Sequence, residues 1–430
     1  MKNILRLALL GVLAAALAIP AGCGILRRER TGVSSGEGEA AQPVKVEREP
    51  EAAGTDGAET QGRAPLPILA QAPDAGEDVL RVLFINVGKA DAILVQYGGA
   101  TVLIDTGTEE SAPNLLGALG FMGVEGLDGV ALTHTHKDHI GGFPYLAAAL
   151  PVKRVYGAVY SENKKKGGNR ITEAAEEAEV PLTRLAVGDA LPLGGGVAFE
   201  VIGPRVFNAE DDNDNSLILK LICNGRTLLF TGDMQVAEEE TLLSAGVELS
   251  ADVLKVGNHG NPDATGDAFG RAVAPSIAVI PTNTEEDEDS ANPRVYAALP
   301  GADVRVTQET VLGVLLTIAP DGAMALYNAA PAKAQCSVSL DPPDRDAQTL
   351  TIRNNGGELD VSGWMLQSQR GSELFIFPQG SVIPANASAI LAAQGGAGDF
   401  IFTGEKAPWH KTKADAGILY DAFGQEVARS

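Results

Sequence analysis

Cysteine and histidine are both scarce in this chain of 430 residues, which has three of the first and five of the second. Cys23, Cys223 and Cys336 are too few and too widely separated to form the disulfide framework of a small secreted domain. Aromatic residues make up only 5% of the sequence. Because histidine is so rare, a place where several histidines gather is the first candidate for chemistry.

Positive charge is also in short supply. The chain has 33 Lys and Arg against 56 Asp and Glu, which gives a net charge of −23. Nonspecific nucleic-acid binding depends on neutralising phosphates with cations, so this balance argues against a tight, general DNA binder. The run Lys164–Lys166 is compatible with a phosphate clamp or with a solvated loop. The acidic run Glu285–Asp289 is compatible with a solvated loop or with weak calcium binding.

The N-terminal segment has the pattern of an export signal. Lys2 and Arg6 precede an apolar stretch that is too short to span a bilayer comfortably, and small residues follow it. The end of this segment, Ile19-Pro20-Ala21-Gly22-Cys23, resembles a bacterial lipobox and predicts lipidation of Cys23. Residues 1–23 are therefore interpreted as a lipoprotein-type signal, which predicts an extracytoplasmic protein held at the membrane by a lipid anchor. Cleavage with secretion and a retained anchor are the alternatives.

Composition changes again after the signal. Residues 24–78 are rich in Gly, Ala, Glu and Pro, and they lack the apolar pattern needed to offset the entropy of ordering, so a flexible linker is predicted. From residue 79 to residue 330 strand-like and helix-like patterns alternate, which predicts one α/β domain. Strands are expected at 79–87, 92–97, 101–104, 129–132, 154–156, 198–202, 216–223, 227–230, 253–256, 277–280 and 311–318, and helices at 112–119, 144–150, 172–178 and 236–244.

The histidines gather after one of these strands. His134, His136, Asp138 and His139 follow the apolar run 129–132 directly. A turn after a strand can aim alternate side chains at one point, and imidazole with carboxylate suits zinc, manganese or iron, of which zinc or manganese is the prediction for this site. His134 and His136 can share one ion while Asp138 and His139 face a neighbouring one. A solvated polar loop rich in histidine is the alternative to this predicted site for one or two divalent ions.

The pattern His-x-His-x-Asp-His, followed by two glycines, resembles the signature of metallo-β-lactamase-fold hydrolases. Three further segments match that family and stand in the same order along the chain. They are an Asp after a strand at Asp105, a Thr-Gly-Asp turn at Asp233 and an Asn-His-Gly turn at His259. The resemblance implies an αββα sandwich, with Asp233 bridging two metals. It implies that the metal ligands are His134, His136, Asp138, His139, Asp233 and His259. Asp105 is interpreted as a group that orients ligands by hydrogen bonding, as a turn residue that caps the next segment, or as both.

Finer details resemble one branch, the competence (ComEC-type) DNA-internalisation hydrolases. Gly88 and Asp91 match the opening motif of that branch, although Asn86, Lys89 and Ala90 depart from it. Asp91 is expected to support the ligands together with Asp105. In this branch an Asn-Ser segment, here Asn215-Ser216, replaces a further histidine, so no third imidazole is expected at the first metal position. Asn258 stands where the branch has histidine; it would orient a substrate oxygen or hydrogen-bond within its turn. The predicted substrate contacts are Lys89, Ser216, Lys255 and Asn258.

The resemblance predicts a hydrolase in which metal ions generate hydroxide from a bound water, and the signal segment predicts that it is exported. Asp138 and Asp233 are the predicted catalytic residues, because they would keep that water oriented. The branch favours a phosphodiester substrate, with DNA or a cell-envelope polymer as the expected partner. Two alternatives remain: hydrolysis of another bond, such as a β-lactam, lactone or thioester, and an inactive protein that binds a surface.

Residues 336–430 have a different character, with many short strands separated by Gly and Pro. Segments such as 359–366 and 417–425 resemble a lamin tail domain, which implies an immunoglobulin-like β-sandwich. Trp364 is interpreted as a core aromatic of this sandwich rather than as a ligand-stacking residue. His410 lies in the same domain and is not expected to bind metal.

Overall fold

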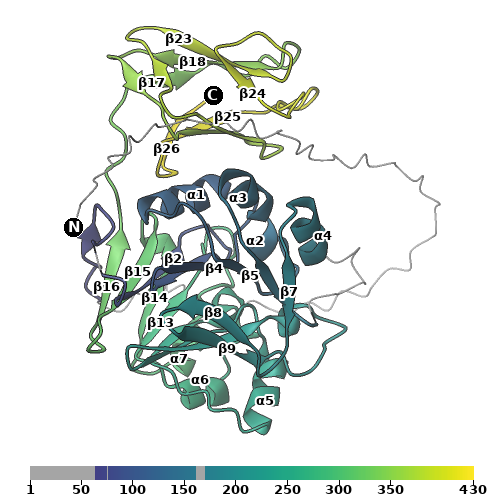
Figure 1. The fold of residues 1–430 in the computed structure, drawn as a ribbon, viewed down its shortest axis with the longest axis vertical. Helices are drawn as coiled ribbons and strands as arrows, with labels where there is room; N and C mark the ends of the chain where they lie inside the picture. The colour runs from purple at the N-terminus through teal and green to yellow at the C-terminus, as the bar shows by residue number, and fades with distance from the viewer. Residues whose placement is uncertain (1–62, 75, 161–169) are drawn as a thin grey trace, which may run out of the picture.

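The computed structural model describes residues 63–74, 76–160 and 170–430. The predicted lipidation site Cys23, the first part of the predicted linker and the Lys164–Lys166 run lie outside these residues. Among the described residues, no helix has the length and apolar character needed to cross a membrane. Figure 1 shows one large domain of two sheets flanked by helices, followed by a smaller domain built of strands.

The first sheet of the large domain has nine strands, and it mixes parallel and antiparallel pairing. Its strands lie in the order β1 (Ile68–Leu69), β16 (Met324–Ala329), β15 (Gly313–Ile318), β2 (Leu80–Ile85), β3 (Ile93–Tyr97), β4 (Ala100–Ile104), β5 (Gly129–Leu132), β6 (Val155–Ala158) and β7 (Leu182–Leu185).

The second sheet has seven strands and is also mixed. Its strands lie in the order β14 (Asp303–Val306), β13 (Ile277–Ile280), β12 (Val253–Lys255), β11 (Arg226–Phe230), β10 (Ile218–Cys223), β9 (Val197–Gly203) and β8 (Ala190–Gly194). The sequence analysis missed β7, β8, β14 and β16.

The central strands are buried on both faces. Successive side chains of a strand point to opposite sides. In β2, Val82 and Phe84 enter the core between the sheets, where Phe84 stacks near Phe230 of β11 with ring centroids 6.4 Å apart. The alternate residues Leu83 and Ile85 pack under helices instead. This double burial explains why the strands are apolar throughout instead of alternating with polar residues.

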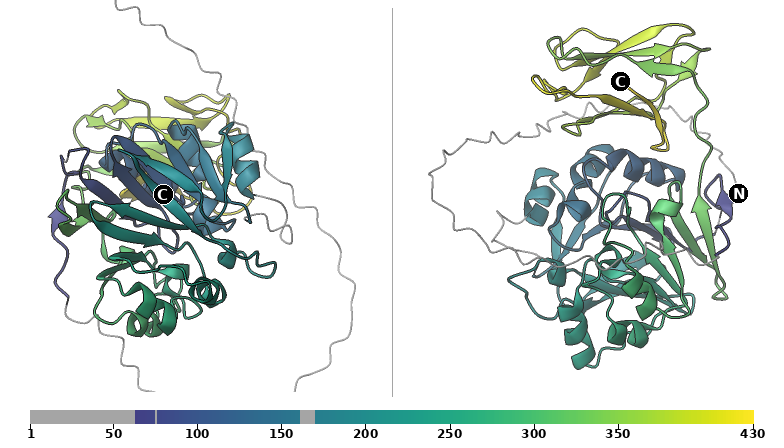
Figure 2. Two further views of the ribbon diagram at one scale, coloured as in Figure 1. Left: turned by 60° about the horizontal axis from the view of Figure 1, so that its bottom comes forward. Right: turned by 180° about the vertical axis from the view of Figure 1, so that it is seen from behind.

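The helices form the two outer layers (Figure 2). Helices α1 (Ala112–Phe121), α3 (Phe143–Ala149) and α4 (Arg170–Glu177) contribute to the core on the outside of the first sheet, and the short α2 (Lys137–Ile140) precedes α3. Helices α5 (Val236–Ser244), α6 (Asp267–Val273) and α7 (Pro293–Ala298) contribute to the core outside the second sheet. The large domain therefore has the four layers, helix, sheet, sheet and helix, that were predicted; α6 and α7 were not predicted.

The predicted linker is too long at its C-terminal end. Residues Ile68 and Leu69 form β1, which pairs in parallel with β16 at the edge of the first sheet (Figure 1). Nearby, Arg305 donates from its guanidinium to the carbonyl oxygen of Ala64 at 3.0 Å. Two residues of strand and a few polar contacts carry no apolar periodicity, so a pattern-based reading of the sequence cannot find them.

The C-terminal domain contains two four-stranded sheets. One has the order β17 (Val338–Leu340), β18 (Thr349–Asn354), β23 (Ser388–Ala393), β24 (Phe400–Phe402), and the other β21 (Leu374–Ile376), β20 (Met365–Ser368), β25 (Gly417–Tyr420), β26 (Glu426–Arg429); β19 (Leu359–Asp360) pairs with β22 (Val382–Ile383). Trp364 and Trp409 lie in the shared core, so Trp364 is a core aromatic. The β-rich architecture agrees with the sequence analysis, whereas the kinship to lamin tail domains stays a prediction.

The two domains meet along α1. Leu116 packs against a small apolar cluster of the C-terminal domain, formed by Met365, Ile418 and Tyr420. The rings of Phe121 and Phe423 meet edge to face with centroids 6.3 Å apart. The side-chain amide of Gln367 donates to the carbonyl oxygen of Glu109, just before α1, at 3.1 Å. Helix α1 is thus packed on one side by the sheet of its own domain and on the other by the second domain.

Two glycines of α1 provide a matched test of this contact. A Cβ at Gly117 would overlap the backbone of Phe423 and Gly424, whereas at Gly120 the nearest such atom, the carbonyl oxygen of Ala422, is 3.8 Å away. We expect Gly117→Ala to destabilise the domain contact by about 1–3 kcal/mol, the usual cost of overpacking. Gly120→Ala is expected to be neutral or to stabilise by up to about 1 kcal/mol, because alanine favours helix. Calorimetry and limited proteolysis would measure both; equal thermal midpoints would contradict the contact.

Candidate metal centre

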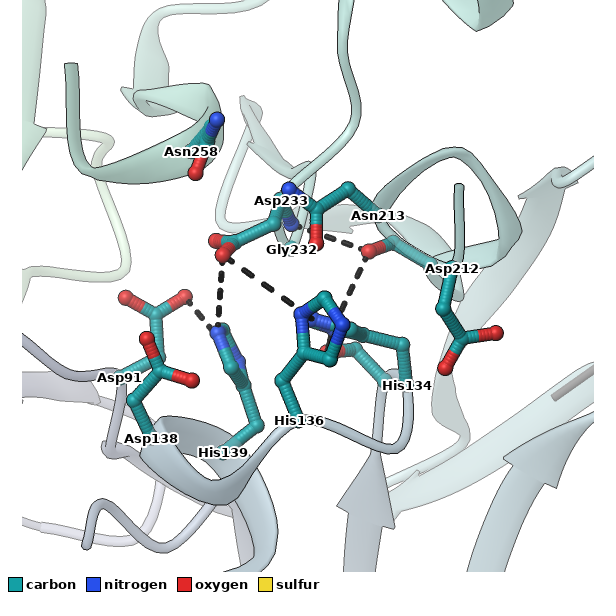
Figure 3. Close-up of polar contacts among 12 residues, drawn as sticks. Asp91, His134, His136, Asp138, His139, Asp212, Asn213, Gly232, Asp233 and Asn258 are labelled. Atoms are coloured by element: carbon teal, nitrogen blue, oxygen red, sulfur yellow. Dashed lines mark hydrogen bonds and ion pairs between the residues drawn. The ribbon is translucent and has the colours of Figure 1, made fainter. Parts of the chain in front are cut away.

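The histidine-rich loop begins where β5 ends and runs into α2. His134 and His136 stand before the helix, while Asp138 and His139 lie in its single turn. The loop is held in place by Thr133 and Thr135, which alternate with the two histidines. Thr133 donates from its backbone N–H and its hydroxyl to Asp105, and Thr135 donates in the same two ways to Asp212. The alternate residues His134 and His136 are therefore turned to the same side, where Figure 3 shows their rings facing Asp233.

Four donors converge on one point. Asp138, His139, Asp233 and His259 each offer an atom within 4.8 Å of the others, and all but the half-buried Asp138 are buried. Asp233 Oδ2 lies 3.0 Å from His139 Nε2 and 3.2 Å from His259 Nε2, and His259 Nε2 lies 3.5 Å from Asp138 Oδ2. Asp233 Oδ1 and His259 Nε2 are buried, and neither has a hydrogen-bond partner in the part of the chain that the structure describes. Because an unpaired buried polar atom is costly, these orphan atoms fit a site that holds a cation.

A second group of donors lies beside the first. His134 Nε2 and His136 Nδ1 are 3.0 Å apart, and His134 Nε2 is 4.0 Å from Asp233 Oδ2. Asp233 thus stands between the two groups, which is the position of a carboxylate that bridges two ions (Figure 3). The residues predicted as ligands are all brought together, from β5 and α2, from the turn after β11 and from the turn after β12.

Charges in the centre are strongly coupled. Burial lowers the pKa of His134 well below its usual value, and the neighbouring His139 lowers it further. Burial also opposes protonation of His259, but the negative charge of Asp233, together with Asp138 and Asp91, outweighs it and raises the pKa of His259 to about 9. A metal ion requires the unprotonated nitrogen, so ion and proton compete for the same lone pair of His259. Carboxylates that attract a proton here would equally attract a cation.

Two aspartates support the ligands from behind. Asp105 accepts from His139 Nδ1 at 2.8 Å, which leaves Nε2 of that ring facing the centre. Asp91 forms an ion pair with the fully buried Lys255, and its Oδ1 lies 3.5 Å from His259 Nδ1. Asp105 has a positive φ of 57°, which bends the chain sharply at the end of β4. The two carboxylates therefore lie where the sequence analysis expected supporting groups.

Two of the predicted substrate contacts are wrong. Lys255 is 1% exposed, and its Nζ donates to the carbonyl oxygen of Gly232 at 2.6 Å in addition to its ion pair, so no substrate reaches it. Ser216 is fully buried, and its Oγ accepts from the backbone N–H of Asp233 at 3.0 Å. Apolar residues precede and follow Lys255 in the sequence, and this pattern predicts a buried side chain.

The other two predicted substrate contacts differ in their surroundings. Lys89 keeps a quarter of its side chain exposed, and its Nζ donates to Asp138 Oδ2 at 2.9 Å. Asn258 donates from its amide to Asp263 Oδ1 at 2.8 Å within its turn, which favours the structural alternative for this residue. Asn258 has a φ of 40° and His259 one of 53°, so the turn that presents the last histidine is left-handed.

Asp212 and Asn213, in the loop that closes the other side of the centre, were not among the predicted site residues, although the neighbouring Asn215-Ser216 was identified. Asp212, Asn213 and Asp214 precede Asn215-Ser216, and the 3-10 turn η2 (Asn213–Asn215) carries them past His134. A run of acidic and amide residues directly before a strand could have marked this loop. His410, in contrast, lies in the C-terminal domain, where its Nδ1 accepts from the backbone N–H groups of Thr412 and Lys413.

Residues 85–284 match the Metallo-beta-lactamase superfamily, so this part of the chain is a metallo-β-lactamase superfamily domain, as the sequence predicted. The chain is similar to ComE operon protein 3 of Bacillus subtilis (strain 168), with 28% identity over 251 residues that cover 54% of this chain and 32% of that protein. It is also similar to Competence protein ComA of Neisseria gonorrhoeae, with 29% identity over 207 residues that cover 47% and 27%. The chain thus spans less than a third of the length of these relatives. The solved metallo-beta-lactamase fold protein YhfI from Bacillus subtilis aligns at 13% identity with a TM-score of 0.36, covering 56% of this chain and 99% of that one.

Proposed function

We propose that this protein is an exported, metal-dependent hydrolase of phosphodiester bonds. The observation that carries the proposal is the convergence of Asp138, His139, Asp233 and His259 within 4.8 Å, beside a second pair of imidazoles. Bound divalent ions, zinc or manganese, would lower the pKa of a water molecule and offset negative charge on the attacked phosphate. Similarity to two competence proteins supports the phosphodiester among the possible substrates.

The protein's own groups divide the remaining work. Asp233 lies between the two groups of imidazoles and contributes negative charge to both. Asp105 accepts from His139 Nδ1 and the carbonyl oxygen of Pro281 accepts from His259 Nδ1, so that both Nε2 atoms face inward. Burial of this whole arrangement removes water that would otherwise weaken its electrostatic interactions.

Lys89 supplies the accessible positive charge beside these carboxylates. Its Nζ lies on Asp138, and the acidic groups Asp138 and Asp233 keep its pKa above the usual value despite its burial. An ammonium group here suits a phosphate oxygen, because Lys is a common point-charge partner of phosphate. The excess of acidic over basic side chains in the chain disfavours a long polyanion, so we propose a short oligonucleotide or an envelope phosphodiester as the substrate.

Export and tethering rest on the sequence of residues 1–23, which lie outside the described residues. Lipidation of Cys23 would place the catalytic domain at the outer face of a membrane, within reach of envelope polymers. Incorporation of a fatty-acid probe is expected in the wild-type protein and not in Cys23→Ser; equal labelling of both would refute the anchor.

A direct test compares substrates on one metal-loaded preparation of the full chain. We expect bis-p-nitrophenyl phosphate to be hydrolysed faster than nitrocefin or a thioester, and chelation to abolish the activity until manganese or zinc is restored. Nitrocefin turnover without phosphodiesterase activity would instead favour a β-lactamase. Inactivity on every substrate class despite full metal occupancy would favour an inactive protein that binds a surface.

Two lysines of the loop region separate the role of Lys89 from general charge. Lys89→Ala is expected to raise the KM for the phosphodiester about tenfold, the effect of losing one charged hydrogen bond. Lys137→Ala removes the same charge from a side chain that is 72% exposed and points to Glu109, so its KM should stay unchanged. An equal effect of both substitutions would show that Lys89 acts only through overall charge.

A further inference from the structure

The protein donors of this centre are unevenly shared between two groups. His139 and His259 stand with Asp138 and Asp233 in the complete group of four donors. The other group has His134 and His136, with Asp233 as its third member. The chain has five histidines in all, and the fifth, His410, is committed to a turn of the C-terminal domain. Zinc and manganese sites take at least four ligands, so this group is one protein donor short of the first.

Most polar groups of the neighbouring loop are already committed. Asp212 accepts from Thr135 through one oxygen and from the amide of Asn215 through the other. The amide oxygen of Asn215 accepts from the backbone of Asn208 at 2.9 Å. Ser216 Oγ accepts from the backbone of Asp233 and lies 3.3 Å from His134 Nδ1, behind the ring and away from Nε2. These residues therefore build the wall of the site and do not offer it a free donor.

Asn213 is different. Its amide oxygen Oδ1 is buried and has no hydrogen-bond partner among the described residues. Its backbone is fixed on both sides, since its N–H donates to Asp211 Oδ1 at 3.1 Å and its carbonyl oxygen accepts from Ser216 N at 3.0 Å. Figure 3 shows the Asn213 side chain reaching over the centre beside Asp233, on the side where His134 and His136 lie. An oxygen held there without a partner has the placement of a ligand.

We propose that the amide oxygen of Asn213 is the missing protein ligand of the metal position formed by His134, His136 and Asp233. The inference rests on the proposed metal dependence and specifies its chemistry. An amide oxygen is a harder donor than imidazole, and carbonyl and carboxylate oxygens suit manganese better than they suit zinc. With Asn213 as a ligand this position has two imidazole nitrogens and two oxygens, as the position of His139 and His259 has, so both positions suit manganese.

Metal titration of the full chain with Mn²⁺ and with Zn²⁺ tests the assignment without reference to turnover. Equilibrium dialysis with elemental analysis gives the stoichiometry, and electron paramagnetic resonance reports the coupling of two neighbouring Mn²⁺ ions. We expect wild type to bind two Mn²⁺, and Asn213→Ala to weaken one of them by about tenfold or more and to lose the coupling signal. Asn213→Asp keeps an oxygen donor and adds charge, so it should bind that ion more tightly. Asn213→His should shift the preference of the same position toward Zn²⁺.

The outcomes separate this inference from the proposed function. Wild-type affinity for both Mn²⁺ ions in Asn213→Ala, with the coupling retained, would overturn the role of Asn213 while leaving a metal-dependent hydrolase. Unchanged affinity in Asn213→Asp would overturn it equally, even if the alanine variant failed to fold. Absence of bound metal in wild type after reconstitution would overturn both proposals. Asn224→Ala serves as the control, because that amide bonds the carbonyl oxygens of Asp78 and Ile318 away from the centre, and its metal affinities should match wild type.

Discussion

Replacing Asp233 by alanine is expected to lower kcat for the phosphodiester by about a hundredfold to a thousandfold, the range for losing one group that stabilises the transition state electrostatically. Asp233 Oδ2 lies within 3.0 to 4.0 Å of the Nε2 atoms of His139, His259 and His134, so one substitution removes a donor from both metal positions. Metal content should fall together with activity, because the three imidazoles then face one another without a carboxylate between them.

The electrostatic consequence of Asp233→Ala is measurable as well. Burial opposes the charged form of His259, and Asp233 is the largest of the influences that raise its pKa to about 9. Without this carboxylate the pKa of His259 should fall, which a nuclear magnetic resonance titration of the metal-free protein would detect. Asp128→Ala is the control, since that carboxylate bonds Thr101 and Lys153 on the surface and its loss should leave kcat and metal content unchanged. Full metal occupancy in Asp233→Ala would contradict a bridging position.

The ligand candidates could be found from the sequence because each stands at a strand end with a recognisable turn. His134 and His139 follow β5, Asp233 follows β11 and His259 follows β12, and parallel pairing of β11 with β12 brings the last two together. Carboxyl ends of neighbouring parallel strands meet at one edge of a sheet, which places Asp233 beside His259. The loop after β5 belongs to the other sheet, and the family resemblance predicted that His134 and His139 join them. The superfamily match over residues 85–284 confirms the prediction at that level.

The supporting interactions could not be found in the same way, because each joins segments that are distant in the sequence. The bond between Thr135 and Asp212 and the ion pair between Lys255 and Asp91 depend on how the two sheets face each other. Lys255 was predicted to contact substrate only because it is a positively charged residue near a metal motif. Packing in three dimensions makes it a buried structural cation instead. The edge strand β1 could not be found for a different reason, since its two residues carry no apolar period.

Removing the buried charge of Lys255 is expected to have the largest effect on stability. Lys255 Nζ forms an ion pair with Asp91, lies 3.5 Å from Asp233 Oδ1 and donates to the carbonyl oxygen of Gly232. Burial would lower the pKa of this lysine, but Asp91 and Asp233 outweigh it and keep the pKa above its usual value, so the side chain stays charged at neutral pH. Lys255→Met would leave Asp91 as a buried, unpaired carboxylate, which costs about 3–5 kcal/mol of the free energy of unfolding.

A double-mutant comparison separates the ion pair from packing. Asp91→Asn in the Lys255→Met background removes the stranded charge, so urea unfolding should recover about half or more of the lost stability. Lys220→Met is the matched control. This lysine is also buried, on β10, but within the described residues its Nζ donates to the backbone carbonyl oxygen of Glu248 and to no carboxylate. It should cost about 1–3 kcal/mol, the effect of losing one charged hydrogen bond. Equal losses for the two lysines, or no recovery in the double variant, would show that Asp91 and Lys255 do not hold the base of the metal centre together.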